Sequence, residues 1–340
     1  MERWSRCQFV HGVGVAALGL VAGCGRWPGQ APAVAPKVPT IGYLAPGFGE
    51  SADSPQGTTV EERDAFRHGL SALGYVEGHN LVIEYRYAGD SEAGLREAAA
   101  ELVRLPVDVI VTTGNAATFA AGAATSTIPI VFRNAGDPVG AGLVASLAQP
   151  GGNVTGLANI NVALGGKRLE LLAQVVPGLQ RVALFWDPRA SASAVPELQA
   201  AAQTLGLQLL LFEIREVAEL EGAFDAARAE HADGLLLSGA NLTRSRQQIV
   251  SLAASHRLPT VYPDGQAVRE GGLISYGARL LELHRRAATY VDKVLRGTQP
   301  ADLPIEQPTT FDFVINLRTA QALGLTIPQH VLLQATEVIQ

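Results

Sequence analysis

Two polar turns follow two short runs of β-branched residues, and their side chains could bind a small charged molecule. The two runs are 107–111 and 128–132, and the alanine-rich stretch 116–124 lies between them. Such runs are typical of strands buried on both faces of a parallel sheet, and the stretch between them has the small residues of a crossover helix. The turns therefore lie at the carboxyl ends of neighbouring strands, where open α/β sheets bind their ligands.

The first turn, Thr112-Thr113-Gly114-Asn115, begins the crossover helix. It offers backbone N–H groups and hydroxyls without a bulky side chain, which suits a carboxylate or another small anion. We therefore expect Thr113, Gly114 and Asn115 to bind the ligand.

The second turn, 134–138, carries one fixed negative charge at Asp137. An aspartate before a proline is also a favourable helix N-cap, so Asp137 could simply cap a helix at 139–147. If Asp137 does bind the ligand, an anion-binding turn beside a carboxylate fits a zwitterion such as an amino acid. Both interpretations stay open on the sequence alone.

The second half of the chain offers further polar and aromatic residues at the ends of expected strands. Aromatic rings together with a few amides and hydroxyls are typical of a small-molecule pocket. Each also has a structural explanation, since the tyrosines fit the core or its rim and Asn241 fits a helix cap. These candidates are Asn159 at the crossing between the halves, Trp186 at the mouth of the cleft, Ser238, Asn241, Tyr262 and Tyr276.

Strands and helices alternate from residue 40 onward, which predicts an α/β fold with parallel sheets. The chain is too long for one modest sheet and the pattern restarts after residue 155, so we predict two Rossmann-like lobes joined by a multi-strand hinge. The N-terminal lobe should comprise 40–155 and about 278–305. The C-terminal lobe should comprise 156–277 and about 306–340.

Residues 1–23 are predicted to be a lipoprotein signal peptide. Arg3 and Arg6 precede an apolar run that is shorter than the ~20 residues a membrane-spanning helix needs. Small residues stand directly before Cys24, as in bacterial lipoproteins, so we expect Cys24 to carry a lipid; in the alternative, the signal is an ordinary one and Cys24 has no role. Residues 24–39 should then form a flexible tether that holds the protein on the periplasmic side of the membrane.

The composition argues against several classes of function. The formal net charge of −6 and the lack of basic runs argue against nucleic-acid binding. The seven histidines are scattered, and no nucleophile elbow or P-loop occurs, so we expect no metal, no cofactor and no enzymatic activity. The run His284-Arg285-Arg286 is expected to be a solvated face of a helix.

Several segments, taken in this order, are characteristic of one protein family. They are Leu73-Gly74-Tyr75-Val76-Glu77-Gly78, Thr127-Ile128-Pro129-Ile130-Val131-Phe132 with Gly136-Asp137-Pro138, Gln149-Pro150-Gly151-Gly152-Asn153, Lys167-Arg168-Leu169-Glu170, Gly271-Gly272-Leu273-Ile274-Ser275-Tyr276-Gly277 and Phe313-Val314-Ile315-Asn316-Leu317. In these segments the chain resembles the exported substrate-binding proteins of ABC transporters, which have the type I periplasmic-binding-protein fold. The resembling branch includes tryptophan- and tyrosine-type binding lipoproteins.

This resemblance implies a monomeric protein that closes on a small molecule and presents it to an ABC permease and its ATPase. It also implies that the turn at Thr113-Gly114-Asn115 takes the carboxylate of an amino acid and that Asp137 takes its ammonium group. The chain departs from many relatives after Tyr262, where it has Pro263-Asp264-Gly265-Gln266 in place of an Arg-Glu pair. The ligand's side chain therefore stays open, and a sensory lipoprotein that is not coupled to transport is the alternative function.

Overall fold

The computed structural model describes residues 37–47, 60–89, 91–188, 194–239, 242 and 245–340. The fold is carried by the compact unit Val38–Gln340. Cys24, the predicted signal peptide and Asn241 lie outside the described residues.

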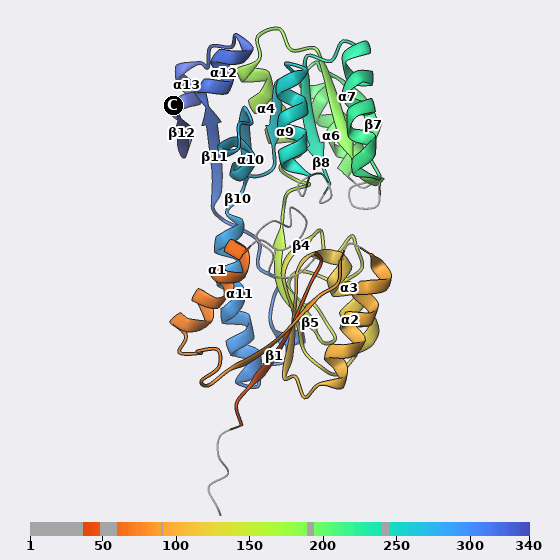
Figure 1. Ribbon diagram of the computed structural model, residues 1–340, viewed down its shortest axis with the longest axis vertical. Coiled ribbons are helices and arrows are strands. Elements are labelled where there is room, and N and C mark those ends of the chain that lie inside the picture. The colour runs from red at the N-terminus through yellow and green to blue at the C-terminus, as the bar shows by residue number, and fades with distance from the viewer. Residues whose placement is uncertain (1–36, 48–59, 90, 189–193, 240–241, 243–244) are drawn as a thin grey trace, which may run out of the picture. The chain divides into compact units, whose positions relative to one another are not determined.

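The first sheet consists of five parallel strands in the order β2-β1-β3-β4-β5 (Figure 1). Its strands are β1 (Thr40–Ala45), β2 (Val82–Tyr87), β3 (Val109–Thr112), β4 (Ile130–Gly136) and β5 (Val154–Asn159). Helices α1 (Val60–Ala72) and α11 (Leu280–Leu295) cover one face, and α2 (Glu92–Arg104) and α3 (Gly114–Ala124) cover the other. Because α11 comes from late in the sequence, this lobe is built from two separate segments of the chain.

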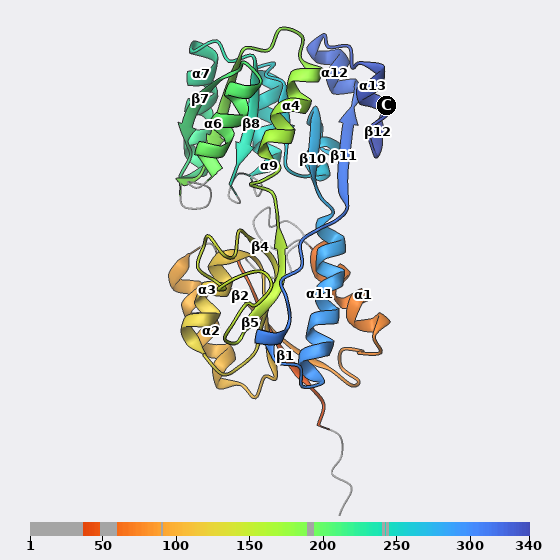
Figure 2. The same ribbon diagram turned by 180° about the vertical axis from the view of Figure 1, so that it is seen from behind.

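The second sheet has seven strands in the order β12-β11-β10-β9-β8-β6-β7 (Figure 2). All neighbouring strands run parallel except β10 and β11. The strands are β6 (Arg181–Trp186), β7 (Gln208–Glu213), β8 (Gly234–Ser238), β9 (Thr260–Tyr262), β10 (Ile274–Ala278), β11 (Phe311–Asn316) and β12 (Glu337–Ile339).

Helices pack on both faces of this second sheet. One face carries α4 (Gly165–Val175), α6 (Ala194–Thr204), α12 (Leu317–Leu323) and α13 (Gln329–Leu332). The other face carries α7 (Leu220–Ala229), α9 (Arg246–Ser255) and α10 (Gly265–Arg269). The short 3-10 helices are η1 (Val217–Glu219) and η2 (Pro300–Asp302). The prediction of an α/β fold with two parallel-dominated lobes is therefore confirmed, while the exact lobe boundaries stay a prediction.

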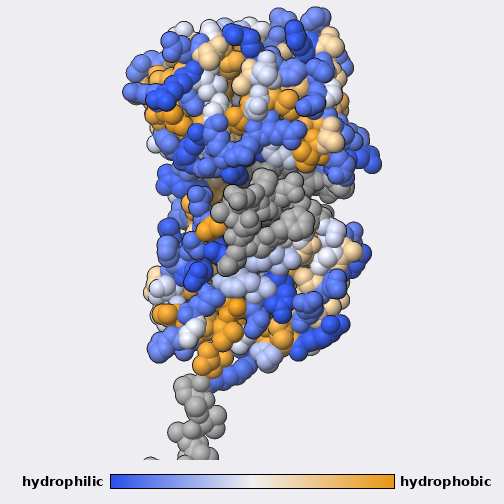
Figure 3. Space-filling view, in the orientation of Figure 1, coloured by the Kyte–Doolittle hydropathy of each residue, from blue (hydrophilic) through white to orange (hydrophobic). Residues whose placement is uncertain are grey.

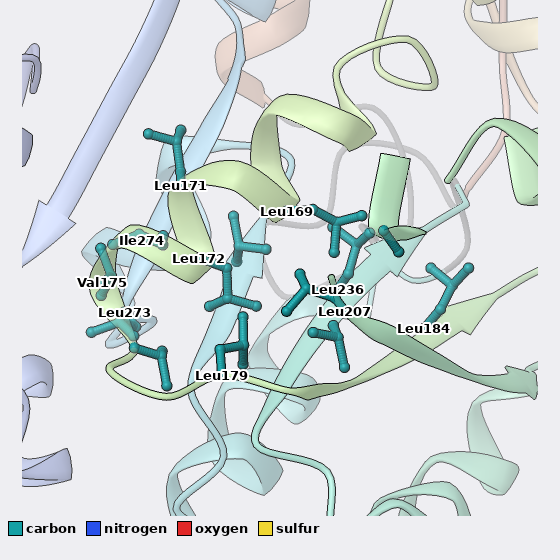
Figure 4. Close-up of a cluster of buried hydrophobic side chains, with 14 of the residues drawn as sticks. Leu169, Leu171, Leu172, Val175, Leu179, Leu184, Leu207, Leu236, Leu273 and Ile274 are labelled. Atoms are coloured by element: carbon teal, nitrogen blue, oxygen red, sulfur yellow. The ribbon is translucent and has the colours of Figure 1, made fainter. Parts of the chain in front are cut away.

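Figure 4 shows how α4 holds its face of the second sheet. Leu169, Leu172 and Val175 recur at helical spacing and are fully buried against Leu184 and Leu236 of the strands. Burial of each such side chain contributes about 1.5–3 kcal/mol. On the outside, Figure 3 shows a mostly hydrophilic face with smaller hydrophobic groups interspersed.

The structure differs from the sequence predictions mainly at residues 133–147 and in three short elements. No helix forms at 139–147, where the chain makes turns; Gly142 has a left-handed φ of 77°, which ends any helix there. Strand β4 continues to Gly136 because its register with β5 shifts after Phe132, so residues expected to form a turn pair with β5 instead. The short elements α10, α13 and β12 were not predicted.

Arg168 binds two of the segments that run between the sheets. The chain passes from one sheet to the other after β5, after β10 and before β11. Arg168 is 2% exposed; its Nε donates to the carbonyl of Tyr276 at 2.7 Å, and Nη1 and Nη2 donate to the carbonyl and Oδ1 of Asn161 at 2.8 and 3.0 Å. Burial lowers the pKa of Arg168 to about 10, so it keeps its charge at neutral pH.

We predict that Arg168→Met lowers the free energy of unfolding by about 2–4 kcal/mol, because the carbonyls of Asn161 and Tyr276 lose a charged donor. Lys167→Met on the same helix is the matched control. Lys167 makes a partly exposed ion pair with Glu170 at 2.8 Å, which is worth at most about 1 kcal/mol. Urea unfolding of both variants measures the difference, and equal losses would show that Arg168 does not hold the crossings.

Candidate ligand-binding site

Four predicted site residues lie where the strand order of a sheet changes direction. In the first sheet the chain goes from β1 to β2 on one side and then to β3 on the other, so the switch lies between β1 and β3. In the second sheet the switch lies between β6 and β8. Thr113 and Gly114 directly follow β3, Trp186 ends β6, and Ser238 ends β8. Open α/β sheets bind ligands at such switch points.

The first turn of α3 has no side-chain cap. Thr113 is the N-cap residue, and its hydroxyl makes no capping hydrogen bond. Gly114 has a left-handed φ of 75°, and the position where a Cβ would stand is open space. The N–H groups of this turn therefore face no capping oxygen from Thr113, as an anion site requires.

Asn115 bridges the start of α3 and the end of β4. Its Nδ2 donates to the carbonyl of Gly136 at 2.7 Å, and its Oδ1 accepts from the N–H of Gly136 at 3.0 Å. These two bonds hold the two predicted turns together. Direct contact of Asn115 with the ligand stays a prediction.

Asp137 is exposed and caps a turn. It has a φ of 39°, and its Oδ1 accepts from the N–H of Gly140 at 2.9 Å. Asp137 therefore does not cap a helix, because no helix follows it. Its carboxylate instead accepts a backbone N–H within a turn. Next to it, Asn159 pairs in register with Gly136 and donates to Oδ1 of Asn134 at 2.6 Å.

In the second lobe, Trp186 and Tyr276 are half-buried aromatic residues. The indole Nε1 of Trp186 is buried without a hydrogen-bond partner in the described part of the chain. Tyr276 stacks on Phe311 with ring centroids 5.9 Å apart. Trp186 also pairs with Ser238 across the switch point, so an aromatic ring and a hydroxyl stand side by side there.

Tyr262 lies in the core, as the structural alternative for this residue expects, and its role as a ligand contact stays a prediction. It is 1% exposed and packs in the hydrophobic cluster that includes Leu237, Val268 and Val314. Burial raises the pKa of its hydroxyl above the usual value near 10. Sequence spacing could not separate core from rim at this position, because both occur at strand ends.

A buried polar cluster under the first switch point was missed. Arg133 of β4 is 0% exposed; its Nη2 donates to the hydroxyls of Tyr43 and Thr113, both at 2.5 Å, and its Nη1 donates to the carbonyl of Glu62 at 3.3 Å. Its guanidinium also lies 4.7 Å from the centroid of the Tyr43 ring. A single arginine inside an apolar strand was the signal in the sequence that could have revealed it.

His284 belongs to the same cluster, and the expectation that it is solvated was wrong. It is 0% exposed, with Nε2 3.6 Å from Oε1 of Glu62, whereas Arg285 and Arg286 are exposed as expected. The helix buries His284 because α1 packs on that side of α11. Burial, and then the charge of Arg133, lower the pKa of His284, so it is neutral at pH 7.

Comparison with protein families gives one match over most of the chain. Residues 56–339 match the model of the family described as "ABC transporter substrate binding protein". The chain belongs to this family. Family members are solute-binding proteins rather than enzymes, which confirms the expectation that the chain performs no catalysis, and they are extracytoplasmic.

Individual proteins similar to this substrate-binding protein are consistent with its family. It is 27% identical over 266 residues to a tyrosine-binding protein of Clostridioides difficile, covering 77% of this chain and 76% of the relative. It is 25% identical, with a TM-score of 0.80, to an ABC domain in complex with L-Trp from Streptococcus pneumonia, covering 89% of this chain and all of the other. A conserved domain protein from Vibrio cholerae is 29% identical, also with a TM-score of 0.80 and the same coverage.

Two further properties concern the described residues only. No group of three or more His, Cys, Asp or Glu side chains among them could hold a metal ion. No helix among them combines the length and apolarity needed to cross a membrane.

We predict that the substrate-binding protein loses stability below about pH 6.5 and that His284 contributes to this loss. Because the folded-state pKa of His284 is lower than the unfolded value near 6.5, the unfolded chain binds more protons in this range, and the free energy of unfolding falls as the pH falls. His284→Leu should therefore show a shallower loss between pH 7.5 and 5.5 in urea unfolding. His68→Asn, at an exposed position of α1, should keep the wild-type profile; a wild-type profile in His284→Leu would contradict the prediction.

We also predict that Asn115→Ala loosens both turns of the site. Amide hydrogen exchange should become faster in 113–118 and 134–138, since the two bonds to Gly136 are lost, and stability should fall by about 1–3 kcal/mol. The matched control is Asn80→Ala, because Asn80 makes a similar two-point bridge, to Val76 N–H and the Gly74 carbonyl, in another turn. Unchanged exchange around Gly136 in Asn115→Ala would remove the positioning role.

Proposed function

We propose that this protein captures an amino acid between its two lobes and delivers it to an ABC permease driven by an ATPase, which imports it. One observation carries the proposal: Thr113 and Gly114 stand at the switch point of the first sheet, and Trp186 and Ser238 stand at that of the second. Each lobe thus offers ligand-binding strand ends. The tyrosine and L-Trp named for two relatives support an amino acid as the ligand.

The first lobe would bind the charged end of the amino acid. The uncapped turn at Thr113 and Gly114 takes the carboxylate, and the exposed carboxylate of Asp137 takes the ammonium group. Asn115 and Asn159 keep the two turns in place through Gly136 and Asn134. Closure of the lobes removes water from both charges, so each must be paired.

The second lobe would bind the side chain of the amino acid. Trp186 and Tyr276 supply flat apolar surfaces, and Ser238 supplies a hydroxyl. The buried indole N–H of Trp186 can donate to an oxygen atom of the ligand. Asn241 follows the same strand end and completes this half of the site in the proposal.

Membrane attachment would come from the N-terminal segment. In this proposal residues 1–23 are removed as a signal peptide, Cys24 carries the lipid, and residues 24–39 form the tether that leaves a monomeric protein on the periplasmic side of the membrane.

We predict that free amino acids stabilise the unit Val38–Gln340, in which Trp186 is the only tryptophan. L-Tyrosine, L-tryptophan and L-leucine are compared with sugars, nucleosides and carboxylic acids that lack an amino group, by thermal unfolding and Trp186 fluorescence. A ligand at a thousand times its dissociation constant adds about 4 kcal/mol of stability and raises the melting temperature by several degrees. Hits only among sugars or nucleosides would refute an amino-acid ligand.

Asp137→Asn tests the ammonium site. Affinity for an amino acid that binds should fall about tenfold or more, while affinity for the same molecule without its amino group should stay similar, because only the amino acid loses a charge partner. Asp225→Asn, at a carboxylate with 78% exposed side chain on α7, is the control that changes net charge by the same amount. If Asp137→Asn binds the amino acid as tightly as the wild type, Asp137 does not hold the ammonium group.

A further inference from the structure

We propose that Arg133 is a positioning residue that makes the turn at Thr113 and Gly114 selective for a carboxylate over a neutral group. The inference rests on the proposed function in one respect, since it assumes that this turn receives the charged end of the ligand. Arg133 itself is 0% exposed and does not reach the ligand, so it acts through Thr113.

The environment of Arg133 is unusual for a buried charge. It follows the fully buried Phe132 in β4, and its hydrogen-bond partners are two hydroxyls and one carbonyl, all of them uncharged. No carboxylate in the described residues forms an ion pair with it, and its Nε is buried without a partner there. A buried charge normally has an ion-pair partner, whereas the described residues offer Arg133 only uncharged oxygen atoms.

Glu62 of α1 is an acidic residue that contacts this cluster. Its Oε1 lies 3.6 Å from Nε2 of His284, while its backbone carbonyl accepts from Arg133. His284 is neutral, because burial and Arg133 lower its pKa. Of these three side chains, Arg133 is therefore the charged one that hydrogen-bonds to the turn before α3, through Thr113.

The bond from Arg133 decides what the Thr113 hydroxyl can do. A hydroxyl has one proton to donate and two positions that accept, and a guanidinium only donates. Arg133 Nη2 occupies one accepting position of Thr113 Oγ1, so the Thr113 proton must point to an acceptor elsewhere. Thr113 does not cap α3, so its hydroxyl proton and the first N–H groups of the helix form a set of donors with no capping side-chain oxygen.

The charge of Arg133 then adds selectivity to this set of donors. In a protein interior, a fixed positive charge one hydrogen bond away favours a ligand that carries a negative charge far more than one that carries a dipole. A carboxamide can accept the same hydrogen bonds as a carboxylate but gains little from the charge. The expected signature of Arg133 is therefore the ratio of affinities for an acid and its amide.

The test measures that ratio by calorimetry with L-tyrosine against L-tyrosinamide and L-tryptophan against L-tryptophanamide. Arg133→Met should lower the acid-to-amide affinity ratio at least about tenfold, and Arg133→Lys should lower it less, because the charge stays but the planar fork is lost. Arg286→Met is the control for net charge, since Arg286 is exposed on α11 and pairs with Glu306. It should leave the ratio unchanged.

A second pair of variants tests the role of the Arg133–Thr113 hydrogen bond even if Arg133→Met does not fold. Thr113→Val keeps Arg133 and the side-chain volume but removes the hydroxyl, so it should lower the same ratio, whereas Thr113→Ser should preserve it. An unchanged ratio in Thr113→Val, or equal weakening of acid and amide binding in the Arg133 variants, would overturn the inference. If the wild type binds neither amino acid nor amide, the proposed function fails first and the inference falls with it.

Discussion

Parallel strand pairing is the constraint on which the rest of this structure depends. In each sheet it brings the carboxyl ends of parallel strands to one edge, and the change in strand order leaves a gap there between the connecting helices. Thr113 and Trp186 lie at these edges although 72 residues that form other strands and helices separate them in the chain. In the proposed function, each lobe offers polar groups at these strand ends to one small ligand.

Two buried arginines hydrogen-bond to segments that the strand pairing does not fix. Arg168 ties the crossing at Asn161 to the carbonyl of Tyr276, and Arg133 ties β4 to Thr113 and Tyr43. Both donate to neutral oxygen atoms. A guanidinium suits this task because its five N–H groups point in fixed directions, so one side chain can orient several acceptors from different segments.

Most of the regular elements could be predicted from the sequence because their signals are local. The runs predicted as strands at 107–111 and 128–132 overlap β3 and β4, because short β-branched runs bounded by turns mark buried strands. Family membership was also predictable, since the motifs are spread along the whole chain in a fixed order. The helix expected at 139–147 does not form. The prediction relied on a weak apolar pattern and gave too little weight to Gly140 and Gly142, which disfavour a helix.

The sequence by itself determined the α/β class, the strand ends that carry Thr113, Asp137 and Trp186, and the family. Only the tertiary structure decided which neighbours the polar side chains contact and which of them are buried. It buried Tyr262 and His284, engaged Asn115 with Gly136, and placed Arg133 beneath Thr113. Such partnerships join residues from different strands and helices, and periodicity along one element cannot reveal which neighbour will cover it.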